Sequence, residues 1–98
     1  MKIAVNMCYG GFHLSDEAVE YLGGKDTVWA FDIERTNETV IKMIEELGTK
    51  RVSYVYSRIG VAEIPDEATD WKIIEYDGAE YVLYVLDGKL NEAYGEVI

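Results

Sequence analysis

The first residues of the chain repeat large apolar side chains every second position, at Ile3, Val5 and Met7. A two-residue period is typical of a β-strand, so we predict a strand at the start of the chain. The glycine pair Gly10 and Gly11 follows at once, and such a pair indicates a turn or loop. The opening segment therefore predicts a strand that ends in a glycine loop.

A first helix is predicted after this loop. Ser15 has the side chain preferred at a helix N-cap, and Asp16 and Glu17 follow it at the positive end of the helix dipole. The glycine pair at positions 23 and 24 predicts the end of the helix.

The clearest helical pattern begins after Asn37, a second candidate N-cap. Apolar residues then recur at a helical spacing until Gly48, which predicts the end of the helix. These apolar positions are Val40, Ile41, Met43, Ile44 and Leu47.

Two segments with β-branched and aromatic residues predict single strands. Residues 27–32 contain no helix-starting signal, and residues 59–64 form an apolar run that Pro65 closes. Residues 71–86 predict a hairpin, because two apolar runs flank Asp77-Gly78, a dipeptide that favours a type I′ turn.

The hairpin turn fixes which residues face each other. It pairs Tyr76 with Ala79 and Glu75 with Glu80, which brings two like charges together, so they are either solvated or share a cation. A second turn signal stands at residues 87–88, and residues 90–98 either return as a short strand or fray.

These elements predict one domain over residues 1–98, because a chain of 98 residues buries one modest core. We expect an α+β fold in which a mainly antiparallel sheet of four to six strands has two helices packed on one face.

The charge balance limits the partners. Nineteen acidic residues against nine basic ones give a net charge of -10, which disfavours direct binding of nucleic acid. No apolar run is long enough for a membrane span, and the single cysteine, Cys8, fits a reducing compartment. We therefore expect a cytoplasmic location and no membrane partner.

Aromatic content indicates association. Eight tyrosines and two tryptophans exceed what one small core buries, and residues 81–86 are apolar on both faces of a strand. Strands of this kind are usually covered on both sides. We expect a homo-oligomer, with a symmetric dimer as the commonest form.

Several motifs are similar to a family of short uncharacterised bacteriophage and prophage proteins, which begin with a strand, Cys-Tyr-Gly-Gly-Phe and a Leu-Ser helix start. The likeness covers most of the chain, although Asn37-Glu38 stands where Asp-Pro is usual and the stretch after Val82 differs. The resemblance implies a bacterial host cytoplasm and three classes of function: a structural accessory, an inhibitor of a host protein, or a protein that sequesters nucleotide immune signals. The matching segments are Asn6 with residues 8–12, Leu14-Ser15 with Ala18, and residues 32–36, 45–48, 63–66, Trp71, 75–78 and Glu80.

The opening loop and the hairpin together contain groups that suit a nucleotide. Aromatic rings can sandwich a base, glycine amides with a helix start and a guanidinium can bind phosphate, and hairpin side chains can bond ribose if the hairpin folds over the loop. The same residues also fit an ordinary turn with packed rings and a surface ion pair. The candidate ligand-binding residues are Tyr9, Gly10, Gly11, Phe12, Ser15, Arg35, Tyr76, Asp77 and Glu80.

Catalytic and metal chemistry have weaker signals. Cys8 and His13 can form a thiolate and imidazole pair across the glycine turn, but a small buried cysteine is commoner. The carboxylates of Asp66, Glu67 and Asp70 lack the spacing of a calcium loop. We expect no enzyme, metal or cofactor.

The expected function is therefore that of a non-enzymatic phage protein that binds and sequesters a small nucleotide-like ligand. The alternatives are an acidic interaction module that inhibits a host protein, or a phage accessory protein. Sequestration requires Arg35 and the glycine amides to face one concavity, whereas the interaction module requires a flat acidic or aromatic patch.

Overall fold

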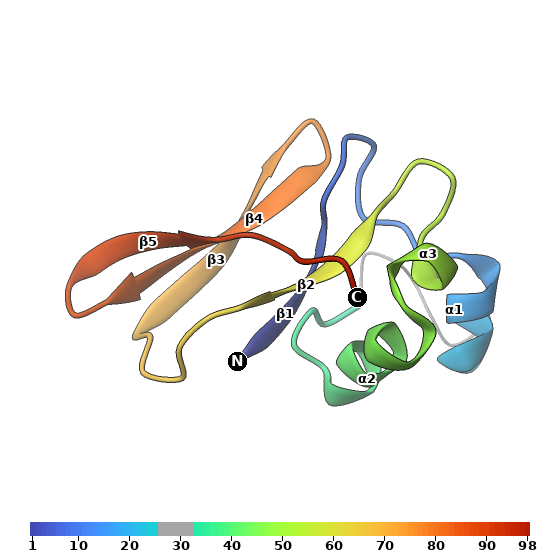
Figure 1. Cartoon of the computed structure of the whole chain (residues 1–98), viewed down its shortest axis with the longest axis horizontal. Helices are drawn as coiled ribbons and strands as arrows, with labels where there is room; N and C mark the ends of the chain where they lie inside the picture. Colours follow the sequence, from blue (N-terminus) through green and yellow to red (C-terminus); the bar gives the residue numbers. More distant parts are fainter. Residues whose placement is uncertain (26–32) are drawn as a thin grey trace.

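The computed structural model describes residues 1–25 and 33–98, and their elements are stacked in layers (Figure 1). These residues contain three short helices and five antiparallel strands, which form one sheet of two strands and one of three. The helices are α1 (Asp16–Tyr21), α2 (Glu38–Leu47) and α3 (Thr49–Val52), and the strands are β1 (Lys2–Asn6), β2 (Ile59–Glu63), β3 (Asp70–Tyr76), β4 (Ala79–Leu86) and β5 (Lys89–Ala93).

The α+β class is confirmed, but the expectation of a single sheet with four to six strands is wrong. Strands β1 and β2 form the two-stranded sheet and are apolar on both faces. One face packs on the helices through Ala4, Ile59 and Val61, and the other packs on the three-stranded sheet through Ile3 and Val5. Because both faces are buried, this strand pair forms a layer between the helices and the second sheet, and the strands divide into two sheets.

Both predicted helices are confirmed, and their caps explain where they begin. The Ser15 hydroxyl accepts from the Ala18 amide at 3.1 Å, and the side-chain Oδ1 of Asn37 accepts from the amides of Thr39 and Val40. The sequence analysis did not predict α3, which follows Gly48 directly. A four-residue helix carries too little periodicity to be recognised.

The strand predictions hold wherever the structure describes the residues. Strand β2 matches the expected segment to within one residue, and the β3–β4 hairpin has the predicted register, with Asp77 and Gly78 both at positive φ (51° and 90°). The residues after the second turn form β5. The chain beyond β5 then contacts strand β2, because Glu96 forms a β-bridge with Val61. The predicted strand over residues 27–32 lies outside the described residues.

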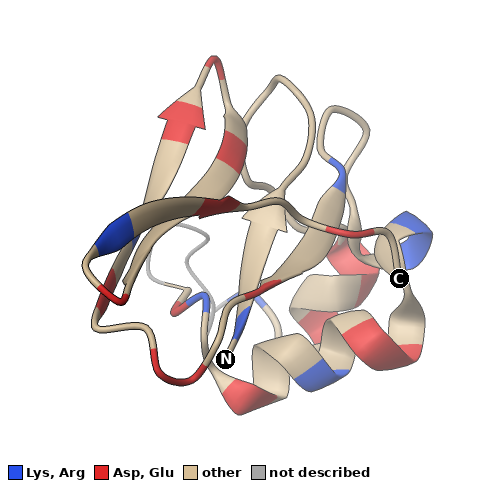
Figure 2. Ribbon diagram, turned by 60° about the vertical axis from the view of Figure 1, so that its left-hand side comes forward, with Lys and Arg blue, Asp and Glu red and all other residues tan. Residues whose placement is uncertain are grey.

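Acidic residues are spread over helices, strands and turns (Figure 2). No helix in the described part of the chain is long and apolar enough to cross a membrane.

Candidate functional site

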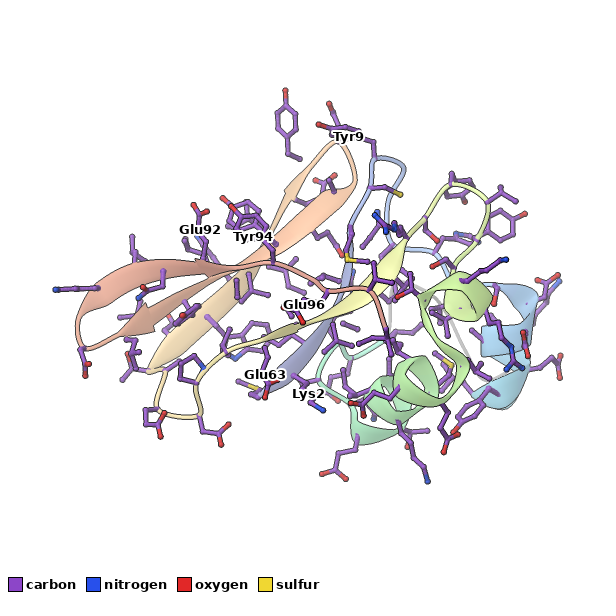
Figure 3. All side chains as sticks on the ribbon, viewed as in Figure 1. Lys2, Tyr9, Glu63, Glu92, Tyr94 and Glu96 are labelled. Atoms are coloured by element: carbon purple, nitrogen blue, oxygen red, sulfur yellow. The ribbon has the colours of Figure 1, made fainter. Side chains whose placement is uncertain are left out.

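Three loops meet at one end of the protein: residues 7–12 after β1, residues 54–58 after α3, and the β3–β4 turn. The Gly10 amide donates to the Asp77 carbonyl at 3.1 Å, and the backbones approach so closely that a Cβ on Gly78 would lie 2.2 Å from the Gly11 nitrogen. A Cβ on Gly10 would lie 2.4 Å from the Tyr56 carbonyl oxygen. Figure 3 shows Tyr9 beside the tip of the β3–β4 hairpin. Glycine at these positions allows the three loops to pack backbone against backbone.

Asn6 holds the three loops together from inside. Its side chain is fully buried, and Nδ2 donates to the carbonyl oxygens of Cys8 (2.6 Å) and Gly78 (2.7 Å). Oδ1 accepts from the Arg58 amide at 2.8 Å. The carboxamide therefore bonds one group in each loop, and its hydrogen-bonding capacity is well satisfied.

Arg35 and Glu80 form a second link, between the segment before α2 and strand β4. Their two N–O distances are 2.7 and 3.0 Å, and Arg35 also donates to the Ala4 carbonyl and lies 3.7 Å above the centre of the Phe12 ring. The Glu80 side chain is only 8% exposed and accepts a further hydrogen bond from the backbone amide of Asn6. Burial, a bidentate pair and a cation–π contact together indicate a rigid connection.

The hairpin does fold over the opening loop, so most of the predicted ligand-binding residues come together. Two of their donors, however, already have protein partners: the Gly10 amide bonds to Asp77, and Arg35 bonds to Glu80. Ser15 lies apart from this cluster, where its hydroxyl caps α1 and donates to the Arg51 carbonyl. Ligand binding at this loop stays a prediction, and a ligand would have to replace these bonds.

The aromatic residues of the predicted site lie in different environments. Phe12 packs against the helical core beneath Arg35, whereas Tyr9 is 68% exposed and Tyr76 is 71% exposed. The expected sandwich of Tyr9 and Phe12 around one ring would therefore require Phe12 to leave its contact with Arg35.

The like charges of Glu75 and Glu80 face each other as predicted, and separate partners accommodate them. Glu80 pairs with Arg35, and Glu75 accepts from the amide of Gly78 in the adjacent turn. The two carboxylates do not share a cation.

Sequence analysis missed the contribution of residues 54–56. Val55 is 90% exposed, and the rings of Tyr54 and Tyr56 pack around His13 with centroid distances of 4.6 and 5.2 Å. The signal was a run of three large apolar residues in a segment that forms no strand. We name the exposed aromatic and apolar side chains on or beside the three loops the tyrosine loop surface, which consists of Tyr9, Tyr54, Val55, Tyr56 and Tyr76.

Cys8 and His13 each contact Tyr56, and no contact among the described residues pairs the two with each other. The thiol donates to the Tyr56 carbonyl at 3.5 Å, and Nδ1 of His13 lies 3.1 Å from the Tyr56 hydroxyl. Within the described ranges, no group of His, Cys, Asp and Glu side chains is arranged to hold a metal ion.

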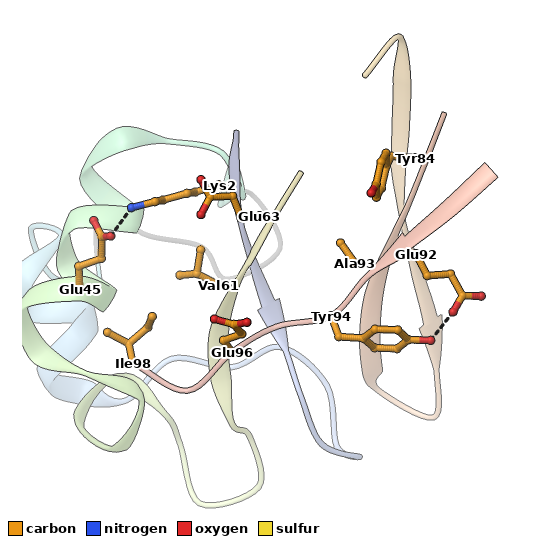
Figure 4. A pocket seen from close by; sticks show the side chains of 10 residues that line it. All are labelled: Lys2, Glu45, Val61, Glu63, Tyr84, Glu92, Ala93, Tyr94, Glu96 and Ile98. Atoms are coloured by element: carbon orange, nitrogen blue, oxygen red, sulfur yellow. Dashed lines mark hydrogen bonds and ion pairs between the residues drawn. The ribbon is translucent and has the colours of Figure 1, made fainter. Parts of the chain in front are cut away.

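A cavity of about 400 Å³ lies between the two sheets, α2 and the C-terminal residues (Figure 4). Glutamates at positions 45, 63, 92 and 96 contribute to its lining. Lys2 donates to Glu45 at 2.6 Å, and this hydrogen bond raises the pKa of the lysine. The side chains of Glu92 and Tyr94 point away from the cavity in Figure 4.

Comparison with known proteins gave no match to a family model, to a curated protein sequence or to a solved structure.

Proposed function

We propose that this chain is a non-enzymatic interaction module that binds a basic surface of another protein through its tyrosine loop surface. The observation that carries the proposal is the strong exposure of Tyr9, Val55 and Tyr76 on three loops that bond to one another. Exposed apolar side chains gathered on one part of a small protein usually mark a binding surface.

Tyrosine on rigid loops suits protein recognition. A tyrosine ring offers a large contact area and a hydroxyl while it loses little side-chain entropy on binding. Asn6 and the ion pair of Arg35 with Glu80 hold the loop backbones in place before a partner arrives. Such preorganisation lowers the entropic cost of association.

Charge indicates the kind of partner. The chain carries a net charge of -10, and Glu75 and Asp77 flank Tyr76 in the hairpin. Oppositely charged surfaces attract each other and speed association. We therefore propose a basic partner surface, and the resemblance to phage proteins suggests that it belongs to a host protein.

This choice follows from the two requirements stated for the competing functions. Sequestration needs Arg35 and the glycine amides to face a ligand, but Arg35 bonds to Glu80 and the Gly10 amide bonds to Asp77. The interaction module needs an exposed aromatic patch, which the tyrosine loop surface provides.

A comparative capture experiment tests the proposal. The wild-type chain, a Tyr9→Ala/Val55→Ala double variant and a Val97→Ala control are immobilised and exposed to bacterial lysate, and bound proteins are identified by mass spectrometry. Val97 is an exposed valine on the C-terminal segment, outside the tyrosine loop surface. Each captured protein is then purified, and its Kd is measured for all three chains by calorimetry.

We expect a basic protein that binds the wild-type chain and the control equally, and the double variant at least about tenfold more weakly, as for interface residues of moderate importance. Binding should weaken when the salt concentration rises, because salt screens exposed charges. Equal affinity for all three chains, or no specific protein at all, would contradict the proposal.

A further inference from the structure

The outer face of the three-stranded sheet is apolar. Ile73, Val82 and Ala93 point inward and join the core shared with β1 and β2. Because side chains alternate along a strand, the neighbouring residues point outward. The apolar and aromatic residues on this outer face include Ile74, Tyr81, Leu83, Val85, Leu90 and Tyr94, with Tyr76 and Ala79 beside the β3–β4 turn.

Three rows of outer side chains cross all three strands, and a fourth, of Tyr76 and Ala79, lies beside the β3–β4 turn. The middle row runs from Lys72 on edge strand β3, through Leu83 on β4, to Glu92 on edge strand β5. It therefore has a basic end, an apolar centre and an acidic end. In the row nearer the β3–β4 turn, the rings of Tyr81 and Tyr94 are stacked, with centroids 5.4 Å apart.

We propose that a second copy of this chain packs face to face on this surface, about a twofold axis that runs parallel to β4 and passes over Leu83. Rotation about such an axis exchanges the two edges of the sheet and leaves the position of each residue along the strand direction unchanged. Lys72 of each copy then lies over Glu92 of the other, and Leu83 lies over Leu83. The surface is thus complementary to itself, as a twofold interface requires.

Two further details favour this axis. A hollow of about 290 Å³ on this face extends from Asp70 to Leu90 of the same chain, and the rotation places Leu90 of the second copy over its β3 side. Leu90 is 68% exposed in the single chain. A twofold axis across the strands would instead stack Lys72 on Lys72, which repels.

The size of the face predicts a weak dimer. Three strands with these spacings give a footprint on the order of 300 Å², below the roughly 800 Å² per partner of a standard interface. Association should therefore depend strongly on protein concentration.

The same twofold axis orients the two tyrosine loop surfaces of the dimer, a point that rests on the proposed function. Because the axis is parallel to β4, both copies direct their β3–β4 turns to the same end. Two tyrosine loop surfaces would then face the same side and could bind a partner with two sites.

Sedimentation of the purified chain tests the dimer without any partner. The wild-type dimer fraction should rise as the concentration increases from about 10 μM to about 1 mM, the range of a weak complex. Lys72→Glu or Glu92→Lys alone should weaken the dimer about tenfold, because each change affects two equivalent pairs. The double swap Lys72→Glu/Glu92→Lys should restore wild-type association.

Controls separate this surface from other modes of association. Lys89→Glu makes the same charge change at a position paired with Leu86, whose side chain is not on the outer face, and should leave the dimer intact. Leu83→Glu should abolish it, with circular dichroism used to confirm folding. A monomer at every concentration, a dimer that survives Leu83→Glu, or a double swap without rescue would overturn the proposal. Dimerisation of the Tyr9→Ala/Val55→Ala chain should be normal, so failure of the proposed function would not affect this result.

Discussion

Arg35 and Glu80 are 45 residues apart in the sequence and form a bidentate ion pair, with N–O distances of 2.7 and 3.0 Å. The pair connects the segment before α2 to strand β4, and it places a guanidinium over Phe12. Both residues were predicted to contact a ligand. In the fold, each is the other's partner.

Removal of Arg35 should therefore destabilise the protein. Arg35→Ala leaves the Glu80 carboxylate nearly buried without its cation, and we expect a loss of about 2–3 kcal/mol in the free energy of unfolding. Urea denaturation measures this loss. Arg51→Ala, which removes an exposed ion pair with Glu17, is the matched control and should have a small effect. Similar losses in the two variants would show that burial adds nothing to the Arg35 pair.

Asn6→Leu should loosen the three loops. Leucine has a similar size but cannot bond to Cys8, Gly78 or Arg58, so several buried polar groups lose their partner. We expect a loss of about 3 kcal/mol in unfolding free energy and faster hydrogen exchange at the Gly10 amide. Asn91→Leu, on β5, is the control and should change neither quantity appreciably. Unchanged exchange at Gly10 in the Asn6 variant would count against its role as the link.

The two hairpin turns offer a matched pair of glycine substitutions. Gly78 and Gly88 both have positive φ, but a Cβ on Gly78 would collide with the backbone of the opening loop, whereas a Cβ on Gly88 meets no atom within 4 Å. Gly88→Ala should cost about 1 kcal/mol from backbone strain alone. Gly78→Ala should cost about 3 kcal/mol, because the loops must also move apart. Thermal or urea unfolding measures both, and equal costs would mean that the loop contact is not tight.

Stability should respond to pH through Glu17. Arg51 lowers the pKa of this carboxyl, first by hydrogen bonding and then by its charge. A lowered folded-state pKa stabilises the protein above the unfolded value near 4.5, and this stabilisation is lost as the pH falls through the folded value. The stability difference between wild type and Glu17→Gln should therefore be present near neutral pH and shrink in acid. A difference that grows in acid would contradict a lowered pKa of Glu17 in the folded protein.

A thermal-shift screen tests nucleotide sequestration directly. The panel contains cyclic dinucleotides, cyclic ADP-ribose isomers and common mononucleotides. A bound ligand at about 100 times its Kd adds about 2.7 kcal/mol of stability and raises the Tm by several degrees. Because Arg35 and the Gly10 amide already have partners, we expect no shift of that size. A ligand that raises the Tm, and loses its effect in Arg35→Ala, would favour sequestration over the interaction module.

Features set by neighbouring residues were predictable from the sequence. The caps Ser15 and Asn37 and the Asp77-Gly78 turn satisfy backbone groups or dihedral angles within a few positions, so their effects do not depend on the rest of the fold. The turn also determined the pairing of Glu75 with Glu80, because the length of a hairpin loop sets its register.

The sequence identified several residues that lie close together in the fold, but not the groups to which they bond. The ligand hypothesis was conditional on the hairpin folding over the opening loop, and their backbones do meet at Gly10 and Gly78. The sequence did not indicate the role of Asn6, because two of its side-chain partners, Gly78 and Arg58, are far away in the chain. The apolar run around Val55 was visible in the sequence, but its exposure in a loop was not.

The sequence by itself determined the α+β class, two helices with their caps, two turns and the register of the first turn, since each depends on local backbone chemistry. Only the tertiary structure decided that the strands divide into two sheets, that Arg35 pairs with Glu80, and that Asn6 joins three loops. These contacts link segments far apart in the chain, and they form because buried apolar faces must be covered and buried polar groups must find partners.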